Sequence, residues 1–133
     1  MTSRLADTHA VVWYLTDSPR LSPAARDAMA KAIDGGFPVL VSVITLVELT
    51  YLVERGRMDS RVRQLLVETL GRQGSGLQPV PFGAEMAEVL AQVSRGAVPD
   101  MPDRMIAATA LWLGIPLVTA DARLRNAGLP VIW

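Results

Sequence analysis

The sequence contains no cysteine and only one histidine, His9. Without cysteine the chain has no disulfide bond, no thiolate nucleophile and no cysteine-based zinc site. A single histidine also excludes a metal site built from several imidazole groups. Any catalytic or metal-binding chemistry must therefore come from other side chains.

The sequence also lacks a charge excess of either sign and a long apolar run. Thirteen basic residues balance 13 acidic residues, so the protein has no net positive charge that would attract nucleic acid. The longest uninterrupted apolar run has six residues, Ala10 to Leu15, whereas a membrane-spanning helix needs about 20. Arg4, Asp7 and His9 lie where a secretory signal would require apolar residues. We therefore expect a cytoplasmic protein with no membrane segment.

Apolar residues are abundant for a chain of this size. They make up 50% of the 133 residues, and the mean hydropathy is +0.29. This length suits one domain with one core, and neither a repeat nor a linker divides the chain. We expect a single domain over residues 1–133, with apolar surface left over for a partner.

Short apolar segments alternate with helical patterns along the chain. Strands are predicted at residues 4–6, 39–43, 77–80, 116–119 and 131–132. Helices are predicted at residues 8–15, 45–54, 60–70, 83–93 and 102–113, with a helical turn at 122–125. A further helix begins near Ser22, with Pro23 at its first position, and ends before Gly35. Strands separated by helices predict right-handed crossovers and a three-layer α/β/α fold around a central parallel sheet.

Four carboxylates fall where the predicted strands end. Asp7 closes the first strand, Glu48 lies in the first turn of the helix after the second strand, and Asp121 follows the strand 116–119. Asp103 opens a helix that runs antiparallel to the strands, so it begins at the same edge of the sheet. Ligands of parallel sheets bind beyond the carboxyl ends of the strands. We therefore expect these four acids to lie together there.

Each of these acids also has a purely structural interpretation. Asp7 and Asp121 fit helix N-caps, and Thr45 with Glu48 fits a capping box. Asp103 lies in a first turn, where the helix dipole favours an anion. Four clustered carboxylates nevertheless repel one another. A hard divalent cation such as Mg²⁺ or Mn²⁺, which prefers oxygen ligands, relieves that repulsion.

Four sequence blocks around these acids resemble the PIN domain family, and within it the VapC-type toxins of type II toxin–antitoxin systems. The blocks are residues 5–10 (LADTHA), 42–49 (SVITLVEL), 102–110 (PDRMIAATA) and 117–124 (LVTADARL), and the similarity continues to residues 131–133. The resemblance implies a ribonuclease that cleaves RNA phosphodiesters with metal-activated water. It also implies a cognate antitoxin as partner, and a homodimer or a toxin–antitoxin hetero-oligomer.

The resemblance assigns the four acids, Asp7, Glu48, Asp103 and Asp121, to a site that holds one or two Mg²⁺ or Mn²⁺ ions. Asp7 and Asp103 are the first choice as direct ligands. Glu48 and Asp121 bind a second ion or orient metal-bound waters. Three neighbouring side chains are candidate substrate contacts, each with an ordinary structural alternative: Thr8, Arg104 and Thr119.

Four more polar residues near the acids have open roles. Asp100 is a helix cap or a fifth carboxylate. Arg123 and Arg125 are phosphate contacts or ordinary solvated arginines. His9 is interpreted as a surface residue at a helix start, because no other residue completes an acid–base pair with it.

Other functions place an acid after the first strand of an α/β fold. A haloacid-dehalogenase-like phosphatase needs a second aspartate two positions later, where this chain has His9. A receiver domain needs a lysine late in the sheet, and Lys31 is the only lysine. The alternatives that stay open are a PIN-type RNA-processing nuclease without an antitoxin and a catalytically weak PIN-like binding module.

Overall fold

The computed structural model describes residues 2–133, so Met1 of the predicted domain lies outside the described residues. The strands are β1 (Arg4–Ala6), β2 (Val39–Ser42), β3 (Leu77–Val80), β4 (Leu117–Val118) and β5 (Val131–Ile132). The helices are α1 (Thr8–Leu15), α2 (Pro23–Asp34), α3 (Val43–Glu54), α4 (Ser60–Gly71), α5 (Ala84–Val89), the 3₁₀ helix η1 (Leu90–Gln92), α6 (Met101–Leu113) and α7 (Ala122–Asn126). No helix in residues 2–133 has the length and apolar character needed to cross a membrane.

The five strands form one parallel sheet in the order β3-β2-β1-β4-β5. The central strand is β1, which pairs with β2 on one side and with β4 on the other. The order of the strands therefore reverses between β1 and β4, and in open parallel sheets ligands bind beyond the carboxyl ends of the strands at such a point. The predicted parallel sheet is confirmed.

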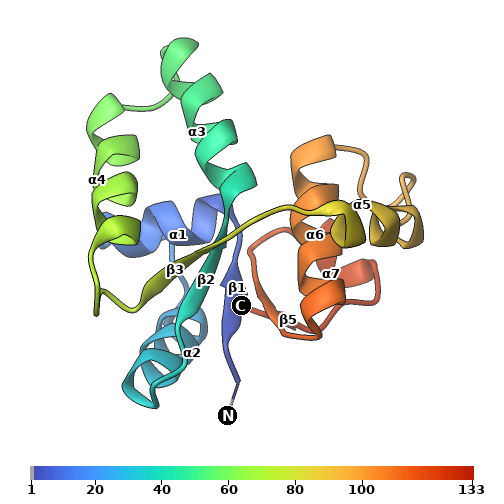
Figure 1. Cartoon of the computed structure of the whole chain (residues 1–133), viewed down its shortest axis with the longest axis horizontal. Coiled ribbons are helices and arrows are strands. Elements are labelled where there is room, and N and C mark those ends of the chain that lie inside the picture. Colours follow the sequence, from blue (N-terminus) through green and yellow to red (C-terminus); the bar gives the residue numbers. More distant parts are fainter. Residues whose placement is uncertain (1) are drawn as a thin grey trace.

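Two apolar clusters cover the two faces of the sheet. Along β1, Leu5 belongs to one cluster and Ala6 to the other, as the alternation of side chains in a strand requires. One cluster draws on α1, α2 and α4, and the other on α6 and α7. Figure 1 shows these two groups of helices on opposite sides of the strands, which confirms the three-layer arrangement.

Helix α3 continues directly from the end of β2. Ser42 is the last residue of the strand and also the helix N-cap, and its Oγ accepts a hydrogen bond from the Ile44 amide at 3.1 Å. The predicted helix start at Thr45, and the capping box between Thr45 and Glu48, are therefore wrong. The serine cap starts the helix at Val43, two residues earlier than predicted.

The predicted helix 83–93 is in fact two elements. α5 ends at Val89 and a turn of 3₁₀ helix follows, which is a common way for a helix to end. The Arg104 guanidinium donates hydrogen bonds to the carbonyls of Leu90 and Val93, at 3.1 and 2.9 Å. The Leu90 carbonyl also accepts from the Val93 amide at 3.0 Å, so the bonds from Arg104 tie α6 to the end of the 3₁₀ turn.

Candidate active site

Asp7 stands at the end of the central strand and caps α1. Its Oδ1 accepts a hydrogen bond from the Ala10 amide at 2.9 Å, and its Oδ2 accepts one from the Thr119 hydroxyl. The residue is only 7% exposed. Burial raises the pKa of Asp7 more than these two hydrogen bonds lower it. The capping interpretation and the predicted position at the edge of the sheet both apply to this residue.

Thr119 and Asp121 form the corresponding turn after β4. The fully buried Thr119 hydroxyl accepts a hydrogen bond from the Asp121 amide at 3.0 Å while it donates to Asp7. Asp121 in turn caps α7, since its Oδ1 accepts from the Arg123 amide at 2.9 Å. The ends of β1 and β4 are thus joined through one threonine.

Glu48 reaches the same edge from the first half of α3. The Thr8 hydroxyl donates a hydrogen bond to Glu48 Oε1 at 2.6 Å and lies 3.1 Å from the Thr45 hydroxyl. A threonine hydroxyl has one hydrogen to donate. Because Thr8 gives that hydrogen to Glu48, the Thr45 hydroxyl must donate to Thr8. The hydroxyls of Thr45 and Thr8 are therefore hydrogen-bonded in series, and the second of them donates to the Glu48 carboxylate.

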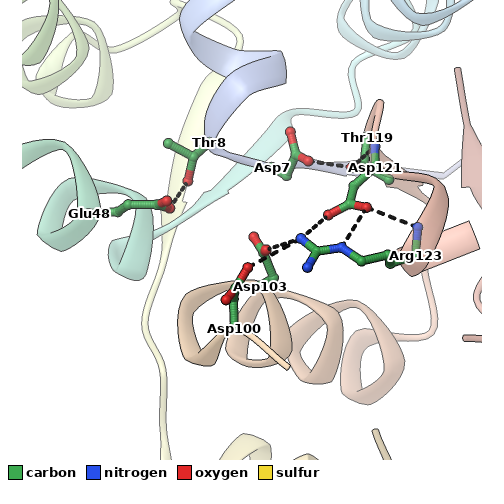
Figure 2. Close-up of polar contacts among 8 residues, drawn as sticks. All are labelled: Asp7, Thr8, Glu48, Asp100, Asp103, Thr119, Asp121 and Arg123. Atoms are coloured by element: carbon green, nitrogen blue, oxygen red, sulfur yellow. Dashed lines mark hydrogen bonds and ion pairs between the residues drawn. The ribbon is translucent and has the colours of Figure 1, made fainter. Parts of the chain in front are cut away.

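Asp103 lies in the first turn of α6, opposite the strand ends. Its pKa is raised to about 6, first by burial and then by the negative charges of Glu48, Asp121 and Asp7. The other three predicted acids are thus near enough for their charges to act on Asp103, and Figure 2 shows all four side chains at the same edge of the sheet. Topology has brought together residues more than a hundred positions apart.

Arg123 lies among the carboxylates on the α6 and α7 side (Figure 2). Its Nη2 is 2.9 Å from Asp121, 3.2 Å from Asp100 and 3.3 Å from Asp103. The hydrogen bond from this guanidinium lowers the pKa of Asp121. Asp100 occupies the N-cap position of α6, but its side chain makes no capping hydrogen bond and pairs with Arg123 instead.

The chemistry of these donors suits a hard divalent cation, because clustered carboxylate oxygens are ligands that Mg²⁺ and Mn²⁺ prefer. Their present geometry is not that of a finished metal cage. In residues 2–133, no three acidic or histidine side chains are arranged so that they would hold an ion together. Thr119, Thr8 and Arg123 occupy oxygens of Asp7, Glu48 and Asp121.

The three candidate substrate contacts all have partners within the protein. Thr8 and Thr119 lie among the acids, where they donate to Glu48 and to Asp7. Arg104 is directed to the carbonyls of Leu90 and Val93 and not to the carboxylates. Contact of these three residues with a substrate stays a prediction.

Thr45 is the participant that the sequence interpretation missed. It was interpreted as a helix cap. In the structure it lies within α3, its side chain is completely buried, and its hydroxyl contacts the Thr8 hydroxyl. One signal was available. Thr45 precedes Glu48 by three residues, and residues at that spacing share a helix face.

Comparison with known proteins agrees with this geometry. The PIN domain family matches residues 4–129. The chain is 31% identical to Ribonuclease VapC22 of Mycobacterium tuberculosis over 136 aligned positions, which cover 100% of both chains. Solved structures with a similar fold include VapBC2 from Rickettsia felis bound to a promoter DNA fragment (TM-score 0.71, 19% identity, 98% of this chain and 97% of that chain). A toxin–antitoxin complex from Klebsiella pneumoniae is also similar (TM-score 0.61, 20% identity, 98% and 96%). The chain belongs to the PIN domain family.

Proposed function

We propose that this protein is a Mg²⁺- or Mn²⁺-dependent endoribonuclease that acts in the cytoplasm as the toxin of a toxin–antitoxin pair, with the whole chain forming its PIN domain. The gathering of Asp7, Glu48, Asp103 and Asp121 at one edge of the sheet carries the proposal (Figure 2). The similarity to a protein named Ribonuclease VapC22 supports RNA as the substrate.

Asp7 and Asp103 would hold the cation directly, with Glu48 and Asp121 completing its surroundings. When bound, the cation would polarise water and offset negative charge on the phosphate oxygens of the substrate. Thr8 and Thr119 would orient two of these carboxylates. Thr119 fixes one oxygen of Asp7 and Thr8 fixes one oxygen of Glu48, so that the remaining oxygens keep a constant direction.

Cleavage of a total-RNA pool, mapped by end sequencing, tests the proposal. Cleavage should occur with Mg²⁺ or Mn²⁺ and stop in excess EDTA. Asp7→Asn and Asp103→Asn should each lower the rate by at least about 100-fold, because even the outer partners of metal ligands contribute 10- to 100-fold. Asp34→Asn, which changes an exposed acid at the end of α2, serves as the control. Undiminished cleavage in EDTA would overturn the proposal.

The antitoxin would bind the outer side of α3 and α4. Val47 and Tyr51 on α3 are 51% and 56% exposed, and Val67 on α4 is 44% exposed. A pocket of about 480 Å³ lies between the two helices, lined by Thr50, Val53, Glu54, Ser60, Arg63, Gln64 and Val67. An amphipathic helix of the partner would place its apolar side chains here. Helix α1 offers less surface to a partner, because Thr8, Ala10, Val11 and Val12 are buried.

Self-association of the protein stays a prediction. Leu111 and Trp112 are a second pair of exposed apolar residues, 39% and 48% exposed, on α6, a helix that lies on the other side of the sheet from α4 (Figure 1). This surface is available for a second copy while the antitoxin occupies α3 and α4.

A further inference from the structure

Arg123 is held at the acidic edge by the local geometry of α7. Asp121 caps this short helix by accepting the Arg123 amide, which directs the arginine side chain back over the cap. The guanidinium then grips the same carboxylate twice, with Nε 3.2 Å from Oδ1 and Nη2 2.9 Å from Oδ2. A two-point contact of this kind orients a guanidinium more firmly than a single ion pair does.

The same Nη2 also serves two carboxylates of the neighbouring helix. It lies 3.2 Å from Asp100 and 3.3 Å from Asp103. One Nη2 carries two hydrogens, so three acceptors must share them. The contact with Asp121 is the shortest of the three and the contact with Asp103 the longest. Within residues 2–133, no other basic side chain forms an ion pair with Asp103 or Asp121.

The position of Arg123 conflicts with a divalent ion at the same carboxylates. An ion coordinated by Asp103 and Asp121 would lie within a few ångströms of the guanidinium, and two positive charges at that distance repel. Two N–H groups also point at oxygens that the ion would use. The Arg123 side chain is 45% exposed, so it is not enclosed by the protein at this position.

We propose that Arg123 is a built-in competitor of the metal ion, since its guanidinium and the divalent cation use the same oxygens of Asp103 and Asp121. The inference rests on the proposed function, because it concerns the metal site of that function. It adds that the chain's own arginine sets the metal affinity, and that the ion binds as Arg123 turns away from the two carboxylates.

Calorimetric titration with Mn²⁺ tests this competition without any measurement of activity. Arg123→Met removes the charge and keeps an unbranched apolar stem close to that of arginine. It should bind Mn²⁺ about tenfold more tightly than the wild type, because the repulsion between a guanidinium and a nearby divalent ion in a largely aqueous setting is on the order of 1 kcal/mol. Arg123→Gln provides a second neutral variant. The gain should shrink at high salt, where the repulsion is screened.

Arg125→Met is the matched control. It changes the charge equally on the same helix, and Arg125 forms no ion pair with the residues that the structure describes. Its Mn²⁺ affinity should stay within about twofold of the wild type, because a more distant exposed charge is largely screened. Asp103→Asn should weaken Mn²⁺ binding in every background, which locates the ion at this site.

The outcomes separate this inference from the proposed function. If the wild type binds Mn²⁺ at Asp103 while both Arg123 variants bind it equally well or more weakly, the competition is refuted and the metal site stands. If neither the wild type nor the Arg123 variants bind Mn²⁺, the metal site and the competition both fail. Tight binding that appears only in the Arg123 variants supports the competition.

Discussion

Single side-chain contacts decide how each carboxylate at the acidic edge behaves. Asp7 and Asp103 both have raised pKa values with burial as the first cause. Asp7 accepts two hydrogen bonds from uncharged donors, whereas Asp103 accepts one from the charged Arg123. Asp121 has a lowered pKa because Arg123 donates to it directly. Acids within one cluster thus titrate over different pH ranges.

Asp103→Asn should stabilise the protein at neutral pH in the absence of divalent ions. The folded-state pKa of Asp103 is about 6, against an ordinary value of 3.8. Between these two values the unfolded chain loses a proton that the folded protein keeps, so the free energy of unfolding falls as pH rises. The loss of stability caused by ionising Asp103 is absent below pH 3.8 and complete above about pH 6. Asparagine does not ionise, so the variant does not suffer this loss.

Thermal unfolding in EDTA between pH 4 and 7.5 measures this effect. The gain in Tm of Asp103→Asn over the wild type should grow through the window from about 4 to 6 and then level off. A change of 1 kcal/mol corresponds to roughly 4 °C in a domain of this size. A gain in Tm that is the same at every pH would contradict the assigned cause.

Thr45→Val should slow RNA cleavage although Thr45 touches no substrate. The change keeps the shape of the side chain and removes the hydroxyl that donates to Thr8. Loss of one such hydrogen bond is worth about 1 kcal/mol, which predicts a rate about fivefold lower. Thr45→Ser keeps the donor and should restore most of the rate. Equal rates for the valine and serine variants would show that Thr45 has only a packing role.

At the scale of elements, α3 connects the site with the partner surface. Its serine cap starts the helix at the end of β2, so Glu48 stands at the acidic edge while Tyr51 lies one turn further along. Arg55 covers the Tyr51 ring at 5.9 Å on the exposed side. A partner seated on α3 would therefore lie close to the carboxylates.

Val67→Asp on α4 should weaken antitoxin binding without loss of RNA cleavage. Val67 lines the pocket between α3 and α4, so the change introduces a charge into an apolar contact. If Val67 is a hot spot of the interface, its loss costs about 2 kcal/mol or more, which corresponds to a loss of about 30-fold in affinity. Co-purification and titration with the partner measure the loss.

Leu65→Asp is the control for this experiment. Leu65 is an exposed apolar residue of the same helix, 37% exposed, and it does not line the pocket. Its substitution should leave the affinity for the antitoxin close to that of the wild type. Equal losses for the Val67 and Leu65 variants would place the partner elsewhere.

At the scale of the whole molecule, negative charge is concentrated at one edge of the sheet although the net charge is zero. The chain has 13 basic and 13 acidic residues, yet its topology gathers four acids at one edge of the sheet. An RNA substrate would approach this edge only when cations offset the negative charge. Local charge, and not total charge, therefore governs the function that we propose.

Expression of the wild-type protein alone should stop cell growth, and co-expression with the adjacent small gene should restore it. Asp7→Asn should be harmless and should still co-purify with the product of that gene, because Asp7 lies outside α3 and α4. Growth curves and total-RNA profiles measure both effects. Intact growth and RNA, with folded protein present, would favour the RNA-processing nuclease without an antitoxin.

The sequence by itself determined the alternation of strands and helices and the placement of acids where strands end. Both follow from local patterns: side-chain periodicity in the elements, and the rule that parallel strands share one carboxyl edge. The four blocks around Asp7, Glu48, Asp103 and Asp121 also indicated the family, which the match to residues 4–129 confirms. The start of α3 was misjudged because Thr45 and Ser42 both fit a cap.

Only the tertiary structure decided which groups the carboxylates meet. Thr119 meets Asp7 across 112 positions of sequence, and Thr8 meets Glu48 across 40. Arg123 reaches Asp100 and Asp103 from another helix. Contacts of this kind depend on how two elements pack and how far a side chain extends, and neither quantity is encoded in a local pattern. Thr45 and Arg123 therefore acquire their roles at the acidic edge only once the chain has folded.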